Sequence, residues 1–332
     1  MTMVLTRTPY RVSFFGGGSD YPAWYLKEGG AVLSTSINQY CFLSCRVLPP
    51  FFNVKYRVVW SHIEAVNSIA EILHPAVREG LRFLKFEDLG GLEILHQGDL
   101  PARSGMGSSS AFAVGLIKAL LTLRDIEIGR HELALRAIEL EQSWLKENVG
   151  SQDQVATAHG GLNVIRFHCD GTIKVEPLVL DPVFKSRLAS HLMLIFTGTS
   201  RLSSQVAQTV IESLSQKQSV VRRMHAMVDE AAAVLKAGDL TGFGEMLHEA
   251  WMLKRGLSAS VSNSNVDELY DTARAAGAIG GKLLGAGGAG FVLLFVPPER
   301  RQDVLKTFKH SLCVPFQFEE AGCQVIYRAG DR

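Results

Sequence analysis

The alternation of apolar and polar positions predicts that the first half of the chain is rich in β-strands. Strands are expected where short apolar or alternating runs are bounded by turn residues. Such runs precede residue 100 at Tyr10–Phe15, Ala31–Ile37, Cys41–Leu48, Val54–Trp60 and Leu92–His96. Further along, the pattern predicts a hairpin around Asp170-Gly171 and then a buried strand. These segments are Gly161–His168 paired with Thr172–Pro177, followed by His191–Phe196.

Apolar positions with helical spacing predict helices between and after these strands. The expected helices are His74–Phe86, Ala111–Leu123, Arg130–Lys146, most of Ser203–Leu257 with a break at Gly238-Asp239, and Asp267–Ala276. Two further strands, Gly280–Leu284 and Phe291–Val296, surround a glycine loop. The change from strand-rich to helix-rich sequence near residue 180 predicts two domains, residues 1–182 and 183–332. Because strands and helices do not alternate regularly, the expected fold class is α+β.

Composition and charge narrow the class of protein. The chain has 332 residues, enough for about two domains, and 47% of them are hydrophobic. Lys and Arg number 34 against 33 for Asp and Glu, so the formal net charge is +1. A dedicated nucleic-acid binder usually carries a large basic excess, and that class is therefore excluded. A small anionic substrate stays open, because a local basic pocket need not change the total.

The cysteines and the N-terminal residues favour a cytoplasmic protein. Five scattered cysteines are typical of reduced thiols rather than of a disulfide framework. The first residues contain no apolar secretory segment. The longest apolar runs are far shorter than the ~20 residues of a membrane helix. The sequence therefore predicts small-molecule partners, with no nucleic-acid or membrane partner, and it leaves self-association open.

The glycine loop Gly285–Gly290 matches the G-x-G-x-x-G pattern of dinucleotide-binding proteins. That pattern should open a helix, but the strand-like run Phe291–Phe295 follows it, so this interpretation is rejected. A protein-kinase interpretation also fails, because the chain has no H-R-D or D-F-G motif. A tight hairpin remains the alternative, although four glycines in six residues exceed what a hairpin needs.

A second loop, Leu100–Ala111, runs into an apolar helix and has the features of an anion-binding site. Its glycines let the backbone approach a ligand, and the start of the helix offers free N–H groups and the positive end of a dipole. Ser108, Ser109 and Ser110 add hydroxyls for phosphate or Mg²⁺. The alternative is a serine N-cap, for which one serine would suffice.

A third loop and two carboxylates complete the candidate chemistry. Tyr10–Tyr21 presents Arg11 from a strand and Asp20 from a glycine turn, an arrangement that by itself also fits an ordinary β-turn. Glu141 lies in the apolar stripe of its predicted helix, so it needs a metal ion, another cation or a buried Arg or Lys as a partner. Asp153 follows a glycine turn and could serve only as a helix N-cap.

Together these segments resemble the GHMP kinases, the superfamily of galacto-, homoserine, mevalonate and phosphomevalonate kinases. The three motifs are Pro9–Tyr21, Pro101–Ala111 and Lys282–Phe295. The segment from Glu141 to Asp153 is similar to the block that carries the family's magnesium and catalytic carboxylates. The resemblance implies an N-terminal domain with a ribosomal protein S5 domain 2-like fold and a ferredoxin-like C-terminal domain. It also implies an active site in the cleft between them.

Within this superfamily the first motif departs from the galactokinases, which carry Glu-His-Thr-Asp where this chain has Gly17–Asp20. The segments Gly16–Pro22, Gly150–Gln154 and Trp251–Lys254 resemble kinases of D-glycero-D-manno-heptose 7-phosphate and their fucokinase-like relatives. This resemblance implies transfer of phosphate from ATP to the anomeric hydroxyl of a sugar phosphate. The product would supply nucleotide-activated heptose for surface polysaccharides.

The resemblance also implies roles for individual residues. Asp153 would accept the anomeric proton, and Arg11 would keep that carboxylate ionised and offset the developing charge. Mg²⁺ would be held by Ser109 and Glu141. The residues expected to bind ATP are Arg103, Ser104, Gly105, Met106, Gly107, Ser108, Ser109 and Ser110. The residues expected to bind the substrate are Gly17, Gly18, Ser19, Asp20, Gly287, Gly288, Arg201 and Lys254.

A heptose 7-phosphate carries a second charged group far from its reacting hydroxyl, and a local basic subsite should receive it. Arg201, in a polar turn after the strand His191–Phe196, is the first candidate, because arginine makes bidentate contacts to phosphate. Arg103, Lys254 and Arg255 are the other candidates. Two alternatives for the whole chain stay open: a fucokinase-like or mevalonate-type kinase, and a sensor of nucleotide or sugar phosphate without activity.

Overall fold

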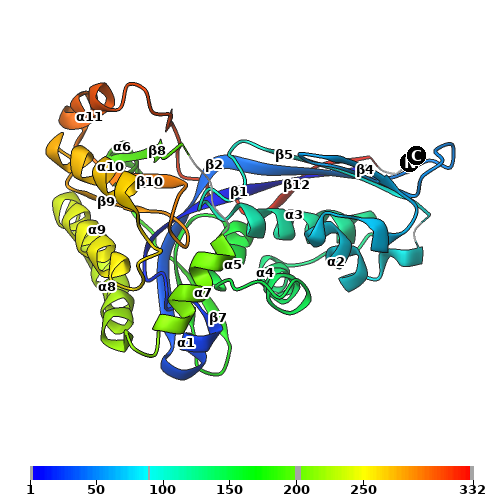
Figure 1. Ribbon diagram of the computed structural model, residues 1–332, viewed down its shortest axis with the longest axis horizontal. Coiled ribbons are helices and arrows are strands. Elements are labelled where there is room, and N and C mark those ends of the chain that lie inside the picture. Colours follow the sequence, from blue (N-terminus) through cyan, green and yellow to red (C-terminus); the bar gives the residue numbers. More distant parts are fainter. Residues whose placement is uncertain (1–2, 89, 199–202, 330–332) are drawn as a thin grey trace.

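The computed structural model describes residues 3–88, 90–198 and 203–329, and in this part of the chain two β-sheets are flanked by helices (Figure 1). The larger sheet consists of β1 (Met3–Phe15), β2 (Gly30–Val47), β3 (Tyr56–Val59), β4 (Ile63–Val66), β5 (Leu92–Gly98), β6 (Leu162–Phe167), β7 (Ile173–Pro177) and β12 (Gln324–Ala329). The smaller sheet consists of β8 (Leu192–Phe196), β9 (Gly280–Leu283), β10 (Phe291–Phe295) and β11 (Cys313–Val314). The strand orders are β12-β1-β2-β5-β3-β4, with β6 and β7 added beside β2, and β11-β8-β10-β9.

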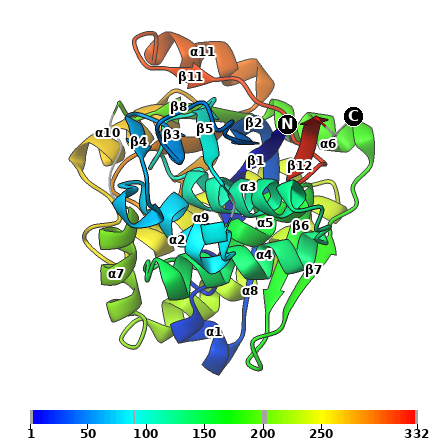
Figure 2. The same cartoon turned by 90° about the vertical axis from the view of Figure 1, so that its right-hand side faces the viewer.

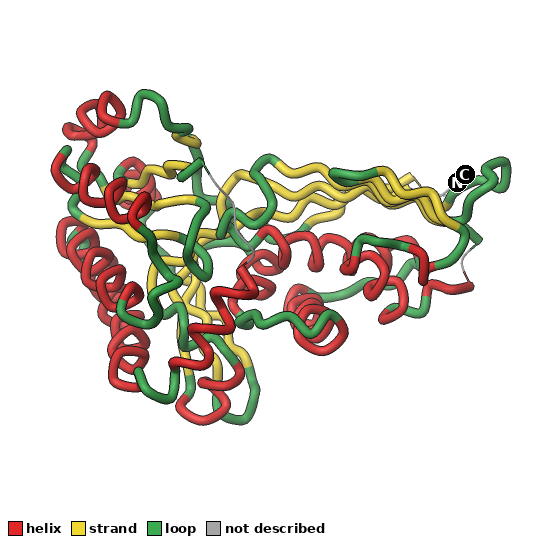
Figure 3. Tube along the Cα trace, viewed as in Figure 1, coloured by secondary structure: helices red, strands yellow, loops and turns green. Residues whose placement is uncertain are grey.

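Helices lie along one side of the long arm of the larger sheet and beside the smaller sheet (Figures 2 and 3). The helices before residue 160 are α1 (Pro22–Glu28), α2 (Pro75–Phe83), α3 (Ser108–Leu123), α4 (Arg130–Glu139) and α5 (Gln152–His159). The helices after residue 180 are α6 (Pro182–Ser190), α7 (Ser203–Ser213), α8 (Gln218–Lys236), α9 (Leu240–Arg255), α10 (Ser264–Ala275) and α11 (Arg301–Thr307). The apolar helix α3 packs on β1 and β2, and α9 packs on β9. The expected α+β fold class is confirmed.

The first two strands are longer than the hydrophobic pattern predicted. β2 continues through residues 38–40, which separate the two strands expected there, and β1 begins seven residues before Tyr10. The polar Asn38 does not interrupt β2, because its N–H donates to Gln317 O at 3.0 Å and its side-chain oxygen accepts from Gln317 N at 2.7 Å. A distant segment therefore satisfies polar groups that look like a turn in the sequence.

The helix expected over Arg130–Lys146 is α-helical only to Glu139 and continues as a π-helical turn to Trp144. α4 ends at Glu139, and a π-helical turn follows at Leu140–Trp144, with Leu145 N donating to Leu140 O at 2.9 Å.

Two turns expected from the sequence are confirmed. β6 and β7 form the hairpin around Asp170, and the helical region breaks at Gly238. Asp239 then caps α9 by accepting a hydrogen bond from Gly242 N at 2.8 Å.

The last strand crosses the expected domain boundary. β12 pairs with β1 in the larger sheet, with Met3 opposite Ala329, although it follows the whole smaller sheet in the sequence. It covers an edge of β1 that would otherwise leave backbone groups unpaired. The final strand of the range 183–332 therefore lies with the N-terminal elements. The division near residue 182 itself remains a prediction.

Two further expectations concern the cysteines and the membrane. All five cysteines are free thiols, and Cys41, Cys45 and Cys323 are buried. Burial raises the pKa of Cys323 to about 11, so its thiol is not readily ionised. In the described part of the chain, no helix combines the length and the apolar character needed to cross a membrane.

Candidate active site

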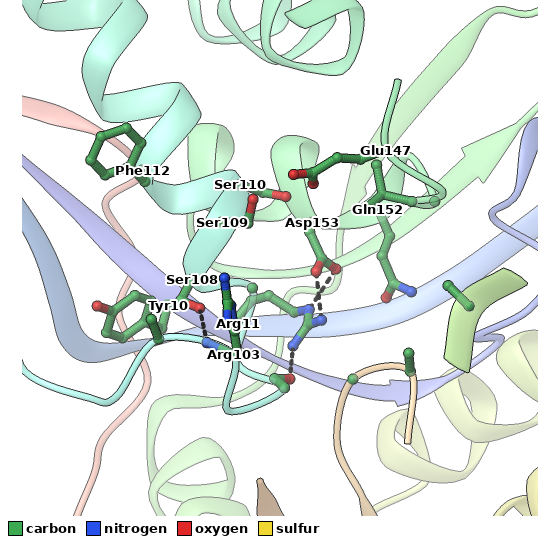
Figure 4. A pocket seen from close by; sticks show the side chains of 18 of the residues that line it. Tyr10, Arg11, Arg103, Ser108, Ser109, Ser110, Phe112, Glu147, Gln152 and Asp153 are labelled. Atoms are coloured by element: carbon green, nitrogen blue, oxygen red, sulfur yellow. Dashed lines mark hydrogen bonds and ion pairs between the residues drawn. The ribbon is translucent and has the colours of Figure 1, made fainter. Parts of the chain in front are cut away.

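A cavity of about 810 Å³ lies where the three motifs meet. Arg11 and Asp20 reach it from the first motif, the serines at the start of α3 from the second, and Gly285 from the third. Lys254 on α9 lines the same cavity, so its walls come from both halves of the chain. Figure 4 shows the side chains around this cavity. The expected meeting of the motifs in one cleft is confirmed.

The second motif presents the start of α3 to the cavity. α3 begins at Ser108 rather than at Ala111, so the three serines form its first turn, and Gly107 is the N-cap residue with φ of 73°. A left-handed N-cap without a side chain leaves the first N–H groups of the helix open to a ligand. The expected ATP-binding residues that line the cavity are Arg103, Gly105, Gly107, Ser108, Ser109 and Ser110.

Ser104 and Met106 have structural roles instead. Both side chains are fully buried and neither lines the cavity, so a direct contact of these side chains with ATP is not supported. The carbonyl of Met106 accepts from Arg11 N at 3.1 Å, and the carbonyl of Ser104 accepts from Phe291 N at 3.1 Å. Their backbones tie the second motif to the first and the third.

Arg11 and Asp153 form a bidentate ion pair in the cavity. Arg11 Nε donates to Asp153 Oδ1 and a terminal guanidinium nitrogen donates to Oδ2, both at 2.7 Å. The other terminal nitrogen donates to Gly105 O, also at 2.7 Å, so the guanidinium connects the carboxylate to the second motif. The Arg11 side chain is 3% exposed and that of Asp153 is 24% exposed, which leaves the carboxylate accessible to a ligand.

The place of Asp153 in α5, as well as its ion pair with Arg11, fixes its position in the cavity. It lies in the first turn of α5, whose N-cap residue is Ser151, so the alternative that Asp153 is only an N-cap is wrong. A Cβ added to Gly107 would lie 3.1 Å from Arg11 Cγ and 3.4 Å from Asp153 Oδ2. Glycine at that position therefore lets the helix start approach the ion pair closely.

Glu141 is fully buried next to the first turn of α3. Its carboxylate accepts hydrogen bonds from Ser109 Oγ at 2.6 Å, Ser110 Oγ at 2.7 Å and Gln154 Nε2 at 2.5 Å. Burial raises the pKa of Glu141 to about 7, because the ionised form loses its hydration. Within the described residues these donors are hydroxyls and an amide, so the alternative of a buried Arg or Lys partner is wrong.

The oxygen atoms of Ser109 and Glu141 fit a Mg²⁺ ion. Both are hard donors, they lie 2.6 Å apart, and a divalent ion would supply the positive charge that this buried carboxylate lacks. Among the described residues no group of three or more His, Cys, Asp and Glu side chains could hold a metal. Mg²⁺ does not need one, since it usually takes one or two carboxylates together with phosphate and water oxygens.

Asp20 is the buried carboxylate of the first motif. Its oxygens accept from Gly18 N and from Gln152 Nε2, each at 2.9 Å, and burial raises its pKa. Gly17 and Gly18 line the cavity with it. The expected role of Ser19 in substrate binding is not supported, because its hydroxyl bonds Gly16 O at 2.8 Å and Ala31 O at 2.9 Å, away from the cavity lining.

The third motif is a loop between β9 and β10, as the hairpin alternative supposed, and it also reaches the cavity through Gly285. A Cβ on Gly285 would lie 2.5 Å from Gly105 Cα, so the second and third motifs touch. Gly287 and Gly288 do not line the cavity, which corrects their expected role in substrate binding. Gly287 packs against Val261 O, and Gly288 N donates to that same oxygen at 2.9 Å.

The basic candidates for a distal phosphate are placed differently. Arg103 lines the cavity with its backbone at a φ of 60°. Lys254 lines it as a buried side chain. Arg255 instead forms an ion pair with Asp267 at 2.9 Å and does not line the cavity. Arg201, the first candidate, lies outside the described residues, so its role stays a prediction.

Sequence analysis missed an aromatic group that lines the cavity. The ring centroids of Trp60 and His74 are 4.8 Å apart, His74 stacks on Phe112 at 4.7 Å, and His96 meets Phe112 at 5.1 Å. Phe112 lies on the side of the cavity away from Gln152 (Figure 4). Burial lowers the pKa of His74 to about 4, so this surface is uncharged at neutral pH. These rings come from separate segments of the chain, so no local sequence pattern predicts that they lie together.

Two charged residues of the cavity were also missed. Glu147 lines it from the loop after the π-helical turn, and burial raises its pKa. Lys282 lines it from β9, with Nζ donating to Phe14 O at 2.8 Å. The position of Lys282 at the start of the third motif was a usable signal, because that motif was already assigned to the site.

Models of one protein family match two parts of the chain. The model described as GHMP kinases N terminal domain matches residues 67–161, and the model described as GHMP kinases C terminal matches residues 231–310. Together the two matches cover just over half of the chain.

Individual relatives extend the similarity to nearly the whole chain. A D-glycero-alpha-D-manno-heptose 7-phosphate kinase from Campylobacter jejuni is 28% identical over 93% of this chain and 94% of its own. The bifunctional fucokinase/GDP-fucose pyrophosphorylase of Arabidopsis thaliana is 28% identical over 92% of this chain and 32% of its own length. The crystal structure of a D-glycero-D-manno-heptose 1-phosphate kinase from Bacteroides thetaiotaomicron superposes with a TM-score of 0.77 at 25% identity, covering 98% of this chain and 100% of that one.

Three motifs in family order converge on one cavity, and the family's N- and C-terminal models match on either side of the predicted boundary. The chain therefore belongs to the GHMP kinase family and is a phosphotransferase with a hydroxyl group as acceptor.

Proposed function

We propose that this GHMP kinase uses ATP to phosphorylate the anomeric hydroxyl of D-glycero-D-manno-heptose 7-phosphate, which gives the 1,7-bisphosphate. Its relatives support the coarser statement that it is a sugar kinase. The observation that carries the proposal is the Arg11–Asp153 pair, which shares a cavity with the start of α3 and the buried Asp20. Phosphoryl transfer needs these parts: a phosphate cradle, a proton acceptor and a site that orients the attacking hydroxyl.

The nucleotide would bind between the aromatic group and the start of α3. Trp60, His74 and Phe112 offer flat, uncharged surfaces suited to a purine base. The N–H groups and hydroxyls of residues 108–110 would hold the phosphates, helped by the positive end of the helix dipole. The γ-phosphate would then lie near Gly107, which packs closely against Arg11 and Asp153.

Ser109 and Glu141 would hold the Mg²⁺ ion of the nucleotide, and that ion would neutralise charge on the phosphate oxygens when bound. The remaining work falls to the protein's own groups. Hydrogen bonds from Ser109, Ser110 and Gln154 keep the Glu141 carboxylate in one orientation. Arg11, fixed by Gly105 O and Asp153, presents its positive charge to the transferred group.

Asp153 would accept the proton of the anomeric hydroxyl as the new O–P bond forms and the bond to ADP breaks. Its carboxylate is accessible and held in one position by the two contacts to Arg11. Asp20, oriented by Gln152, would accept hydrogen bonds from other sugar hydroxyls. The sugar would thereby be held with one hydroxyl directed at the γ-phosphate, which supplies most of the rate enhancement in such reactions.

The identity of the sugar rests on relatives whose names differ. One is named for heptose 7-phosphate, one for heptose 1-phosphate and one for fucose. The fucokinase-like alternative is therefore kept. The sensor alternative is not supported, because the chain belongs to a kinase family and holds Glu141 beside Ser109 and Asp153 in the cavity.

A substrate panel tests the proposal. Purified protein with Mg²⁺ and ATP is offered D-glycero-D-manno-heptose 7-phosphate, the unphosphorylated heptose, L-fucose, D-galactose and mevalonate, and ADP release is followed. We expect the heptose phosphate to give the highest kcat/KM, with a glycosyl phosphate signal in the ³¹P NMR spectrum of the product. Preferred use of L-fucose would establish the alternative, and a product phosphorylated only at a primary hydroxyl would reject the anomeric assignment.

A further inference from the structure

Two lysines from different elements lie buried in the wall of the active-site cavity. Lys254, near the end of α9, is 8% exposed, and Lys282, on β9, is 4% exposed. Both line the cavity together with Asp20 and Gly18. Lysine is rarely buried to this extent without an acidic partner, so the pair requires a physical explanation.

The hydrogen bonds of both ammonium groups go to backbone carbonyls. Lys254 Nζ donates to Gly285 O at 2.5 Å and to Leu283 O at 3.1 Å. Lys282 Nζ donates to Phe14 O at 2.8 Å. Each ammonium group has three N–H donors. Within the described residues, one donor on Lys254 and two on Lys282 are therefore left for a ligand.

The charges around the pair do not balance. In the described part of the chain neither lysine forms an ion pair. Besides the other lysine, the charged groups whose electrostatic effect reaches the pair are Arg11, Asp20 and Asp153. Asp153 is already matched by Arg11 at 2.7 Å. Asp20 is then the carboxylate left for two ammonium groups. A buried excess of positive charge is costly, and a bound anion would remove that cost.

We propose that Lys254 and Lys282 form a two-lysine site for a phosphate group carried by the acceptor substrate, an inference that rests on the proposed sugar kinase activity. Ser13 is the residue before Phe14 in β1, and its buried hydroxyl has no hydrogen-bond partner among the described residues. It lines the cavity with the lysines and supplies a further donor. Two ammonium groups and a hydroxyl match a dianion with three oxygen acceptors.

The position of the site favours the acceptor's phosphate over the phosphoryl group being transferred. Arg11 marks the place of transfer, because it binds Asp153, while Lys282 is anchored at Phe14 on the same strand. Three residues of strand separate the backbone positions of Arg11 and Phe14, about 10 Å at 3.3 Å per residue. Lys254 lies between these two places, because it binds Gly285 O and Gly285 packs against Gly105, whose carbonyl binds Arg11. A separation of that order suits a sugar with its reacting hydroxyl at one end and a phosphate at the other.

The experiment compares phosphorylated and unphosphorylated D-glycero-D-manno-heptose in the wild type and in Lys254→Met and Lys282→Met. Each lost charge-assisted contact should lower kcat/KM for heptose 7-phosphate roughly 10- to 100-fold through KM, leaving the KM for ATP unchanged. Activity on the unphosphorylated heptose should fall by a smaller factor, so the ratio of the two kcat/KM values is the readout. Lys118→Met is the matched control, because Lys118 Nζ also donates to a backbone carbonyl, Ile128 O at 3.2 Å, but does not line the cavity.

A binding measurement on the wild type keeps the proposal testable if the variants do not fold. Burial lowers the pKa of Lys254 to about 8, and a bound phosphate should restore its proton. Calorimetry at pH 8.5 should show tighter binding of heptose 7-phosphate than of heptose. A comparison of two buffers with different ionisation enthalpies should also show proton uptake with the 7-phosphate.

The outcomes separate this site from the kinase activity. Equal use of both sugars by the wild type, or equal affinity for the 7-phosphate and for heptose, would overturn the two-lysine site and leave the sugar kinase intact. A raised KM for ATP in the variants would assign the lysines to the transferred phosphoryl group and likewise overturn it. Failure to phosphorylate any sugar would instead reject the proposed function, and this inference with it.

Discussion

The substitution Asp153→Asn tests the central feature of the proposed mechanism. Asparagine keeps the size and shape of the side chain but removes the charge and the ability to accept a proton. In the present geometry Asp153 receives two hydrogen bonds of 2.7 Å from Arg11. After substitution, one of these donors faces an amide NH₂ group, so the bidentate contact cannot be kept.

The expected effect on catalysis is large and specific. Loss of a positioned general base typically costs ~10²–10⁴ in kcat, or about 3–5 kcal/mol of activation free energy. The KM for ATP should stay within about threefold, because the phosphates are expected to lie on residues 105–110 rather than on Asp153. Stability should also fall, because Arg11 is 3% exposed and loses its counter-charge. Breaking a fully buried pair costs about 3–5 kcal/mol, but Asp153 is 24% exposed and solvent screens the charge, so we expect about 1–2 kcal/mol.

The assay follows ADP release with heptose 7-phosphate at saturating Mg²⁺–ATP, at a temperature where thermal unfolding shows both proteins to be folded. Asp229→Asn is the matched control, because Asp229 also pairs with an arginine, Arg166, at 2.7 Å but is 62% exposed and does not line the active-site cavity. It should leave kcat unchanged. If Asp153→Asn retains more than about a tenth of the wild-type kcat, transfer proceeds without this base and the role given to Asp153 is wrong.

Three further predictions concern the metal, a glycine and pH. Glu141→Gln should raise the Mg²⁺ concentration for half-maximal activity roughly tenfold with little change in sugar KM; an unchanged Mg²⁺ titration would exclude Glu141 as a ligand. Gly285→Ala should lower the free energy of unfolding by about 1–3 kcal/mol, measured in urea, because its φ is 72° and the new Cβ would lie 2.5 Å from Gly105 Cα; equal stability would show that the loops can separate. Lys254 has its pKa lowered from 10.5 to about 8, so between these values the unfolded chain binds more protons and the free energy of unfolding should rise with pH. Burial also lowers the pKa of Lys282, so both lysines contribute to the rise. In Lys254→Met the rise should be smaller by about 3 kcal/mol at most, and urea unfolding of both proteins at pH 7.5, 9 and 10 would check it.

The features predicted correctly from the sequence are those that depend on short-range chemistry. Glycine at residues 105, 107 and 285 predicted backbone that approaches a ligand, and these positions have φ of 80°, 73° and 72°. The serines before an apolar run predicted an open helix start, and the pattern around Gly238 predicted the break before α9. These predictions succeed because turn geometry, helix ends and the burial of a helix face are decided within a few residues.

The same local logic explains the site residues that were assigned wrongly. Ser19, Gly287 and Gly288 lie within the right motifs, but their polar atoms or their lack of a side chain serve packing inside the loop. A sequence motif indicates that a loop adopts a particular backbone conformation. It does not report which of its residues meets the ligand and which holds the loop.

Contacts between groups that are distant in the sequence became visible only in the folded chain. Arg11 and Asp153 are 142 positions apart, yet two 2.7 Å hydrogen bonds join them. Lys282 binds Phe14 O across 268 positions, and β12 returns to pair with β1 from the far end of the chain. The partners of a buried charge depend on how separate elements pack, and the cost of burying that charge depends on those partners. The charge balance of the cavity, and with it the two-lysine site, is therefore a property of the assembled fold.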